Sequence, residues 1–121
     1  MFEIHIEDSF ASAHYLRHYA GKCENLHGHN YRVEVSILSE TLDQADLALD
    51  FTIAKKWLKA ILETLDHKCL NDLPMFESDN PSAEIIAKYI YSQYKLLLPS
   101  GVKMSKVKIW ETVRNALSYW E

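Results

Sequence analysis

Cysteine is scarce in this 121-residue chain, and no apolar run approaches the roughly 20 residues that a membrane span needs, so we expect no membrane partner. The N-terminus lacks the basic start and apolar run of a signal peptide. The two cysteines, Cys23 and Cys69, are therefore expected to be free thiols in a reducing, cytoplasmic location. The chain also lacks internal repeats and low-complexity segments.

Positive charge is also in deficit, with 13 Lys and Arg against 17 Asp and Glu and a formal net charge of -4 at pH 7. This balance argues against nucleic acid as the main partner, because binding to phosphate backbones needs a basic surface. It does not exclude an anionic small molecule, since the local field matters more than the total charge. The length predicts a single domain over residues 1–121, small enough that a functional cavity forms more easily between subunits than inside one.

Alternation of apolar and polar side chains predicts strands at both ends of the chain. Residues 2–6 alternate in this way, and the strand is expected to continue to His14 with a bulge near residues 8–9. The clearest strand covers residues 31–37, and alternation returns over residues 106–113. A short last strand is expected at residues 116–120.

Two amphipathic helices are expected between these strands. Residues 53–65 carry one apolar stripe, with Thr52 as the expected N-cap. The second helix starts at Ser82 as N-cap, with Glu84 in its first turn, and ends before Pro99. The order ββααββ predicts an α+β fold, in which one four-stranded antiparallel sheet carries both helices on one face.

Three histidines are expected to emerge together on the covered, apolar face of the sheet. His27 and His29 have the same parity as the apolar residues of the second strand, and His14 has the parity of the apolar residues of the first. A shared metal is the simplest way to satisfy three imidazoles there, and three histidines leave a fourth coordination position open, as in catalytic zinc sites. H-x-H alone is weak, since it also describes a strand with two polar positions.

Other polar side chains have alternative roles that their local sequence leaves open. Cys23 is a fourth metal ligand, a nucleophile or base, or an inert buried thiol. Asp66 and His67 form a proton relay with a thiol, or they simply end a helix, where the helix dipole favours a histidine. Glu111 lies in an apolar row, where it binds two adjacent N–H donors of a ligand, pairs with a basic residue or is hydrated. Asp50 has a similar ambiguity, with helix capping as the simpler role.

Six motifs occur in a fixed order along nearly the whole chain. They are Phe10–His14, Cys23 with Leu26–Tyr31, Asp50–Phe51, Leu65–His67 with Leu70–Asn71, Asn80–Glu84, and Glu111–Thr112. Together they resemble the 6-pyruvoyltetrahydropterin synthase family. The resemblance implies the tunnelling fold (T-fold), in which sheets of neighbouring subunits join into an oligomeric barrel. It also implies active sites at subunit interfaces and a homo-oligomer, either a hexamer or a tetramer.

The resemblance also implies roles for individual residues. His14, His27 and His29 would bind Zn²⁺, the expected cofactor. Cys23 would be the catalytic thiol, with Asp66 and His67 completing the relay. Glu111 would anchor the pterin of a pterin triphosphate substrate through its amino-pyrimidinone edge.

The spacing of the second motif is similar to one branch of the family, because only three residues separate Cys23 from His27. Bacterial 6-carboxy-5,6,7,8-tetrahydropterin synthases of queuosine biosynthesis have this short gap, whereas animal-type enzymes carry a longer insert. The branch implies zinc-dependent conversion of 7,8-dihydroneopterin triphosphate to 6-carboxytetrahydropterin, with release of acetaldehyde and triphosphate. The alternatives are the 6-pyruvoyltetrahydropterin synthase reaction and a non-catalytic zinc- or pterin-binding oligomer.

Two positions depart from the family pattern. Ser82 stands where the family usually has threonine, a mild change because both residues cap helices. Asp46 stands where a glycine often precedes Asp50–Phe51, which concerns the geometry of that loop rather than the chemistry.

Overall fold

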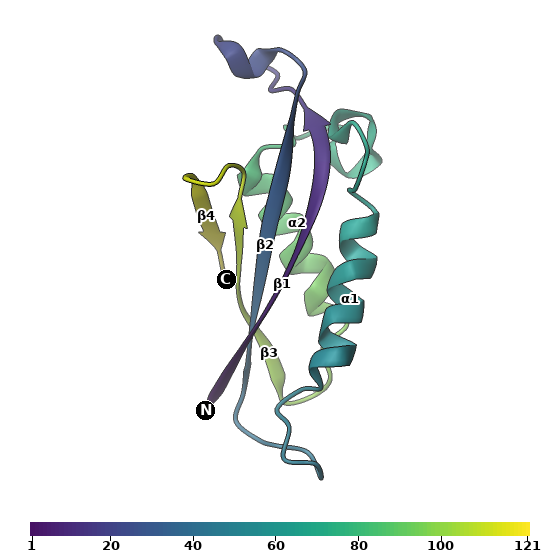
Figure 1. Ribbon diagram of the computed structural model, residues 1–121, viewed down its shortest axis with the longest axis vertical. Helices are drawn as coiled ribbons and strands as arrows, with labels where there is room; N and C mark the ends of the chain where they lie inside the picture. Colours follow the sequence, from purple (N-terminus) through teal and green to yellow (C-terminus); the bar gives the residue numbers. More distant parts are fainter.

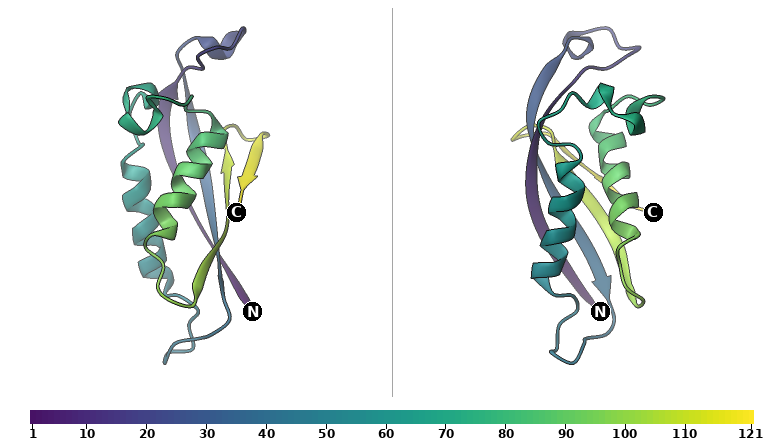
Figure 2. Two further views of the ribbon diagram at one scale, coloured as in Figure 1. Left: turned by 180° about the vertical axis from the view of Figure 1, so that it is seen from behind. Right: turned by 90° about the vertical axis from the view of Figure 1, so that its right-hand side faces the viewer.

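The sheet has four antiparallel strands arranged in chain order, as seen in a computed structural model that describes residues 1–121 (Figure 1). The strands are β1 (Phe2–His14), β2 (His27–Ser39), β3 (Val102–Trp110) and β4 (Ala116–Tyr119). The helices α1 (Phe51–Glu63) and α2 (Ala83–Lys95) both cover one face of the sheet (Figure 2). The predicted ββααββ order is confirmed. Neither helix has the length and apolar character needed to span a bilayer.

The β1–β2 ribbon keeps one register over its whole length, from Phe2 opposite Ser39 to His14 opposite His27. The expected bulge near residues 8–9 is wrong, because Asp8 and Ser9 pair in register like their neighbours. The irregularity lies instead between β2 and β3, at Ser36 and Ile37. An unbroken β1 preserves the alternation of faces up to its last residue, so His14 emerges on the core side.

The hydrophobic core lies between the sheet and the two helices. Even-numbered residues of β1 and odd-numbered residues of β2 point into it, as period-2 alternation requires. Its largest fully buried apolar side chains are Tyr31, Tyr94, Phe76, Ile37, Leu58, Leu65, Leu70, Ile86, Ile90, Ile109 and Val33.

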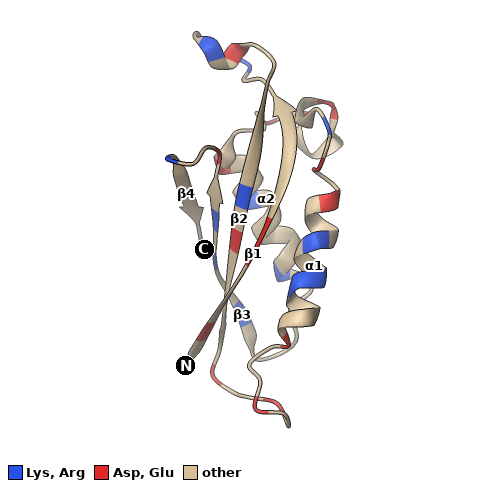
Figure 3. Ribbon diagram, in the orientation of Figure 1, with Lys and Arg blue, Asp and Glu red and all other residues tan.

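The opposite face of the sheet carries charged side chains, and Figure 3 marks charged residues along the strands. Arg32 lies 3.8 Å from the carboxylate of Glu7, and its guanidinium stacks 3.7 Å above the ring of Trp110. His5 Nδ1 lies 2.8 Å from Ser36 Oγ. Acidic and basic groups alternate, so this face presents no large field of one sign.

Both helices are capped at their first turn by a side chain. Asp50, not Thr52, is the N-cap of α1: its carboxylate accepts from Thr52 N at 2.8 Å. Ser82 caps α2 by accepting from Ile85 N at 3.3 Å, as predicted. Asp46 has φ 61°, a left-handed conformation that explains why glycine suits that position.

The segment after β3 differs from the expected continuous strand. β3 ends at Trp110, and Val113 is 97% exposed rather than part of an apolar row. Residues 111–115 form a turn, in which Glu111 N donates to Asn115 O at 3.1 Å. Glu111 therefore reaches the core side from a turn, which frees its carboxylate to meet other groups.

The two helices are joined by one buried polar contact, which allows a test of the packing. Tyr94 Oη donates to Ala54 O at 2.9 Å from a fully buried ring. We expect Tyr94→Phe to lower the free energy of unfolding by about 1 kcal/mol, the net contribution of one hydrogen bond. Tyr89→Phe is the matched control, since its hydroxyl meets Thr64 Oγ1 in an exposed contact, and it should change stability by less than about 0.5 kcal/mol. Chemical denaturation of both variants measures the difference, and equal effects would contradict the packing role of Tyr94.

Candidate metal centre and adjoining cavity

The three predicted histidines meet where β1 ends and β2 begins. His14 is paired directly with His27 across the ribbon, and His29 follows on the same face. One ring nitrogen from each lies within 4.8 Å of the others. Ring centroids are 4.5 to 5.3 Å apart, and the rings meet edge to face instead of stacking. This arrangement lets one nitrogen of each ring approach the other two.

Hydrogen bonds orient two of these rings. His14 Nδ1 lies 2.6 Å from Pro81 O, and His27 Nδ1 lies 2.7 Å from Asn25 O. A ring nitrogen facing a carbonyl must donate, which leaves Nε2 of each ring with a free lone pair. His29 Nε2 is buried and makes no hydrogen bond, although the Glu111 carboxylate lies 3.5 Å away. A buried nitrogen without a partner is costly, and a metal would satisfy it.

Burial shifts the pKa of two histidines of this cluster. Desolvation lowers the pKa of His14 and of His29, and the negative charge of Glu111 opposes that shift in part. Desolvation also raises the pKa of the Tyr31 phenol, whose oxygen lies 3.3 Å from His14 Nδ1 and Nε2. His14 and His29 therefore favour the neutral form that binds metals. Three imidazoles with an open fourth position fit Zn²⁺.

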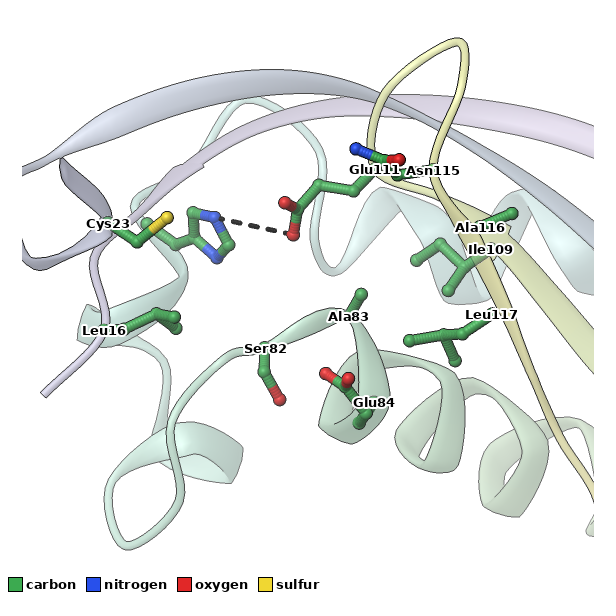
Figure 4. A pocket seen from close by; sticks show the side chains of 11 residues that line it. Leu16, Cys23, Ser82, Ala83, Glu84, Ile109, Glu111, Asn115, Ala116 and Leu117 are labelled. Atoms are coloured by element: carbon green, nitrogen blue, oxygen red, sulfur yellow. Dashed lines mark ion pairs between the residues drawn. The ribbon is translucent and has the colours of Figure 1, made fainter. Parts of the chain in front are cut away.

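A cavity of about 320 Å³ adjoins the histidines (Figure 4). Figure 4 shows Cys23 beside the imidazole, Glu111 reaching in from the turn after β3, and Ser82 and Glu84 at the start of α2. Asn115 and five apolar side chains also contribute to the wall. The cavity combines a thiol and two carboxylates with His14, one of the three clustered histidines.

Glu84 and Asn115 were missed as cavity residues by sequence reasoning. Glu84 was assigned only a favourable interaction with the dipole of α2, yet its carboxylate lines the cavity as Glu111 does. Its place in the Asn80–Glu84 motif was the available signal. Asn115 had none, because its position depends on the turn at residues 111–115.

Cys23 lies on a short 3₁₀ turn, Lys22–Glu24, within the loop that extends beyond the sheet (Figure 1). It is half-buried and its side chain lines the cavity with His14 and Glu111. The group of side chains close enough to share one ion consists of the three histidines and does not include Cys23. The arrangement favours a thiol that faces a bound molecule over a fourth metal ligand.

Asp66 and His67 form a close pair, with Asp66 Oδ2 lying 2.8 Å from His67 Nδ1. Asp66 Oδ1 also accepts from Ala11 N at 2.9 Å, and this hydrogen bond, followed by the one from His67, lowers the pKa of Asp66. His67 has φ 56°, an uncommon conformation for a residue with a side chain, and its ring is 82% exposed. The pair is held firmly while its imidazole faces outward.

The predicted relay is not assembled within one chain. His67 lines a second, more open hollow together with Gly28, His29 and Lys68. Cys23 belongs to the other cavity, which His14 lines. The single chain thus brings the three clustered histidines, Cys23 and Glu111 together, and leaves Asp66 and His67 pointing elsewhere.

A sequence model described as 6-pyruvoyl tetrahydropterin synthase matches residues 3–121. The chain belongs to this family. A 6-carboxy-5,6,7,8-tetrahydropterin synthase from Synechocystis is 36% identical over 126 aligned residues, covering 99% of this chain and 94% of the relative. The Aquifex aeolicus protein of the same name is 34% identical, covering 83% and 76%. Human 6-pyruvoyl tetrahydrobiopterin synthase is 38% identical over 103 residues, covering 82% and 70%.

Solved structures agree with this family assignment. The 6-pyruvoyl tetrahydropterin synthase of Caenorhabditis elegans matches with a TM-score of 0.87 at 30% identity, over 98% of this chain and 94% of that one. The Plasmodium vivax enzyme matches with a TM-score of 0.81 at 22% identity, covering 98% and 96%, and at that identity supports the fold alone. The fold of the chain is therefore that of the family's T-fold enzymes.

Proposed function

We propose that this chain is a 6-carboxy-5,6,7,8-tetrahydropterin synthase of queuosine (7-deazaguanine) biosynthesis. It would convert 7,8-dihydroneopterin triphosphate to 6-carboxytetrahydropterin, with release of acetaldehyde and triphosphate. The observation that carries this proposal is the nearly end-to-end correspondence with the Synechocystis enzyme, 99% of this chain and 94% of the relative. The human enzyme, although 38% identical, covers 82% and 70%. The short gap between Cys23 and His27 supports the same branch.

The metal proposed for the site is Zn²⁺, held by His14, His27 and His29. The support is chemical: three ring nitrogens within 4.8 Å of one another, one of them buried without a partner. When bound, zinc supplies Lewis acidity that lowers the pKa of hydroxyl groups of the substrate side chain. The Pro81 and Asn25 carbonyls hold the two rings with Nε2 available.

The carboxylate of Glu111 is proposed to fix the pterin ring. Two parallel hydrogen bonds from an amino-pyrimidinone edge suit a carboxylate whose ion-pair neighbours are two histidines and no lysine or arginine. Glu111 also lies 3.9 Å from His14 Nε2, so a ring bound by it would sit beside the metal ligands. Glu84 presents a second carboxylate to the same cavity and is the natural comparison.

Protons at the substrate side chain are proposed to move through Cys23 and His67, with Asp66 orienting His67. A thiol and an imidazole both exchange protons near neutral pH, which suits general acid–base work. Because Cys23 and His67 line separate hollows of one chain, the relay needs the Asp66–His67 pair of a neighbouring subunit. The outer edge of β4, and the outer edge of β1 before Ala11, have no strand beside them and offer places for strands of such a subunit. The proposed assembly is a homo-oligomeric barrel, either a hexamer or a tetramer.

Product identification tests the function directly. The purified, zinc-loaded protein is incubated with 7,8-dihydroneopterin triphosphate, and the products are separated and identified by mass. Acetaldehyde together with a 6-carboxypterin is the expected result. A 6-pyruvoyl product with no loss of carbon would assign the chain to the other branch of its family, and release of neither would favour a binding protein.

Glu111→Gln is expected to lower kcat/KM by about 10- to 100-fold. The reason is that a hydrogen bond to a charged partner contributes about 1.5–3 kcal/mol, and each 1.36 kcal/mol is tenfold in rate. Steady-state kinetics and zinc analysis check the result, with zinc content expected to stay at the wild-type level. Glu84→Gln is the matched variant in the same cavity. A larger loss in Glu84→Gln than in Glu111→Gln would move the pterin anchor to Glu84.

A further inference from the structure

The edge of β1 that faces away from β2 is hydrogen-bonded near its C-terminal end to a segment that follows α1. Ala11 N donates to Asp66 Oδ1 at 2.9 Å, and His67 N donates to Ala11 O at 2.6 Å. Two residues further along, Ala13 N donates to Lys68 O at 3.0 Å. Alternate residues of a strand direct their backbone groups to the same edge, so these contacts form one ladder.

Two asparagine side chains continue this ladder beyond the end of β1. Asn71 Oδ1 accepts from Tyr15 N, and Asn71 Nδ2 donates to Tyr15 O, both at 3.0 Å. Asn80 Oδ1 accepts from Arg17 N, and Asn80 Nδ2 donates to Arg17 O, both at 2.8 Å. Each carboxamide thus holds one residue by its N–H and its C=O, as a paired strand would. We call these contacts the Asn71 clasp and the Asn80 clasp.

The Asn80 clasp lies one residue before the carbonyl that orients a proposed metal ligand. Pro81 O is 2.6 Å from Nδ1 of His14, whose side chain is almost completely buried. Pro81 has no N–H, so it cannot be held in place by donating a backbone hydrogen bond. The position of its carbonyl depends on Asn80 before it and on the α2 start after it.

Arg17 reinforces the same arrangement from the other side. Its guanidinium donates to Phe76 O and Asp79 O, each at 3.2 Å, and approaches Asn71 O at 3.5 Å. Asn80 holds the backbone of Arg17, and the side chain of Arg17 in turn donates to carbonyls of the loop that leads to Asn80. Arg17, which follows β1, is therefore bound to this loop both through its backbone and through its guanidinium.

We propose that Asn80 is a positioning residue for the metal ligand His14. Its two hydrogen bonds to the Arg17 backbone keep the Pro81 carbonyl on His14 Nδ1, which holds the ring with Nε2 toward the metal. The Asn71 clasp makes the same pair of hydrogen bonds, to the backbone of Tyr15 next to His14, but the carbonyl that orients the His14 ring belongs to Pro81, the neighbour of Asn80 and not of Asn71. The inference rests on the proposed function in one respect, that the three histidines bind zinc.

Zinc affinity of the metal-free protein tests this assignment. Apo wild type, Asn80→Ala and Asn71→Ala are titrated with Zn²⁺ in competition with a chromophoric chelator, and their thermal unfolding is recorded alongside. Asn80→Ala should bind zinc about 10- to 100-fold more weakly, the usual effect of removing support from a metal-ligating histidine. Asn71→Ala should lose thermal stability as well but keep an affinity near that of wild type. Asn80→Asp retains the acceptor for Arg17 N while losing the donor, so its affinity should lie between wild type and Asn80→Ala.

The outcomes separate this inference from the proposed function. Wild-type affinity in Asn80→Ala, or an equal loss in Asn71→Ala, overturns the positioning role while leaving the zinc site intact. A wild-type chain that binds no zinc overturns the metal centre itself. If Asn80→Ala does not fold, Asn80→Asp decides the question, and an affinity equal to that of wild type in that variant counts against the proposal.

Discussion

Cys23→Ala is expected to retain its zinc and to lose turnover by about 100- to 10,000-fold, the range that a positioned acid or base contributes. The thiol lines the cavity beside His14 and Glu111, yet it is not among the side chains close enough to share an ion. Removing it should therefore leave the three imidazoles in place and abolish one proton transfer to the substrate. Elemental analysis measures the first effect, and single-turnover kinetics with dihydroneopterin triphosphate measures the second.

Cys69→Ala is the matched control for this experiment. Cys69 is also a half-buried free thiol, but it lies on the ladder beside β1, where its backbone is bridged to Ala13, and its side chain lines neither hollow. It should keep both zinc and turnover. Loss of zinc in Cys23→Ala would make Cys23 a metal ligand, contrary to the relay. Full turnover in the same variant would show that the Cys23 thiol takes no part in the reaction, contrary to the relay.

His27→Ala is expected to abolish zinc binding and, with it, turnover. His27 supplies one of three ring nitrogens that lie within 4.8 Å of one another, and two neutral imidazoles are too few for a stable zinc site of this type. The loss of affinity should exceed the roughly 10- to 100-fold expected when a residue that only orients a ligand is removed. Zinc content after dialysis and the chelator titration provide the measurement.

His5→Ala serves as the control for histidine removal. His5 lies on the other face of the sheet, with its Nδ1 2.8 Å from Ser36 Oγ, and shares no cavity with the cluster. Its zinc content should equal that of wild type. Retained zinc in His27→Ala would refute the three-histidine site, because no other histidine or cysteine joins that group.

The histidine cluster was predictable from the sequence because it depends on the shortest-range property of a strand. Alternation of side chains places His27 and His29 on the same face as Tyr31 and Val33 wherever the strand is unbroken. The same rule places His14 with Ile6. The expected bulge near residues 8–9 was wrong, and the unbroken pairing matters because an extra residue there would have changed the face of His14 relative to Ile6.

Local capping was less predictable than the helices themselves. The apolar stripe gave α1 within a few residues, yet Thr52 and Asp50 are both good N-caps, and the choice depends on which backbone turns first. The prediction that the strand continues to residue 113 was wrong for a related reason. Alternation in residues 106–113 cannot reveal that the chain leaves the sheet at Trp110, and that turn is what brings Glu111 within 3.5 Å of His29.

Pairings between distant segments left no pattern in the sequence. The Asn71 and Asn80 clasps join residues 56 and 63 positions apart, and each asparagine by itself reads as an ordinary loop residue. Glu84 is a similar case, because an acidic residue in a first helical turn has a sufficient local explanation. Its second role exists only because α2 begins opposite the turn after β3 (Figure 4).

By itself, the sequence determined the order of the elements, the face on which three histidines gather and the family to which the chain belongs. Each follows from short-range periodicity or from motifs read in order. Only the tertiary structure decided which of the remaining polar groups share a cavity. It placed Cys23, Glu84 and Glu111 together and set Asp66 and His67 apart, because contacts between distant segments depend on how loops close over the sheet.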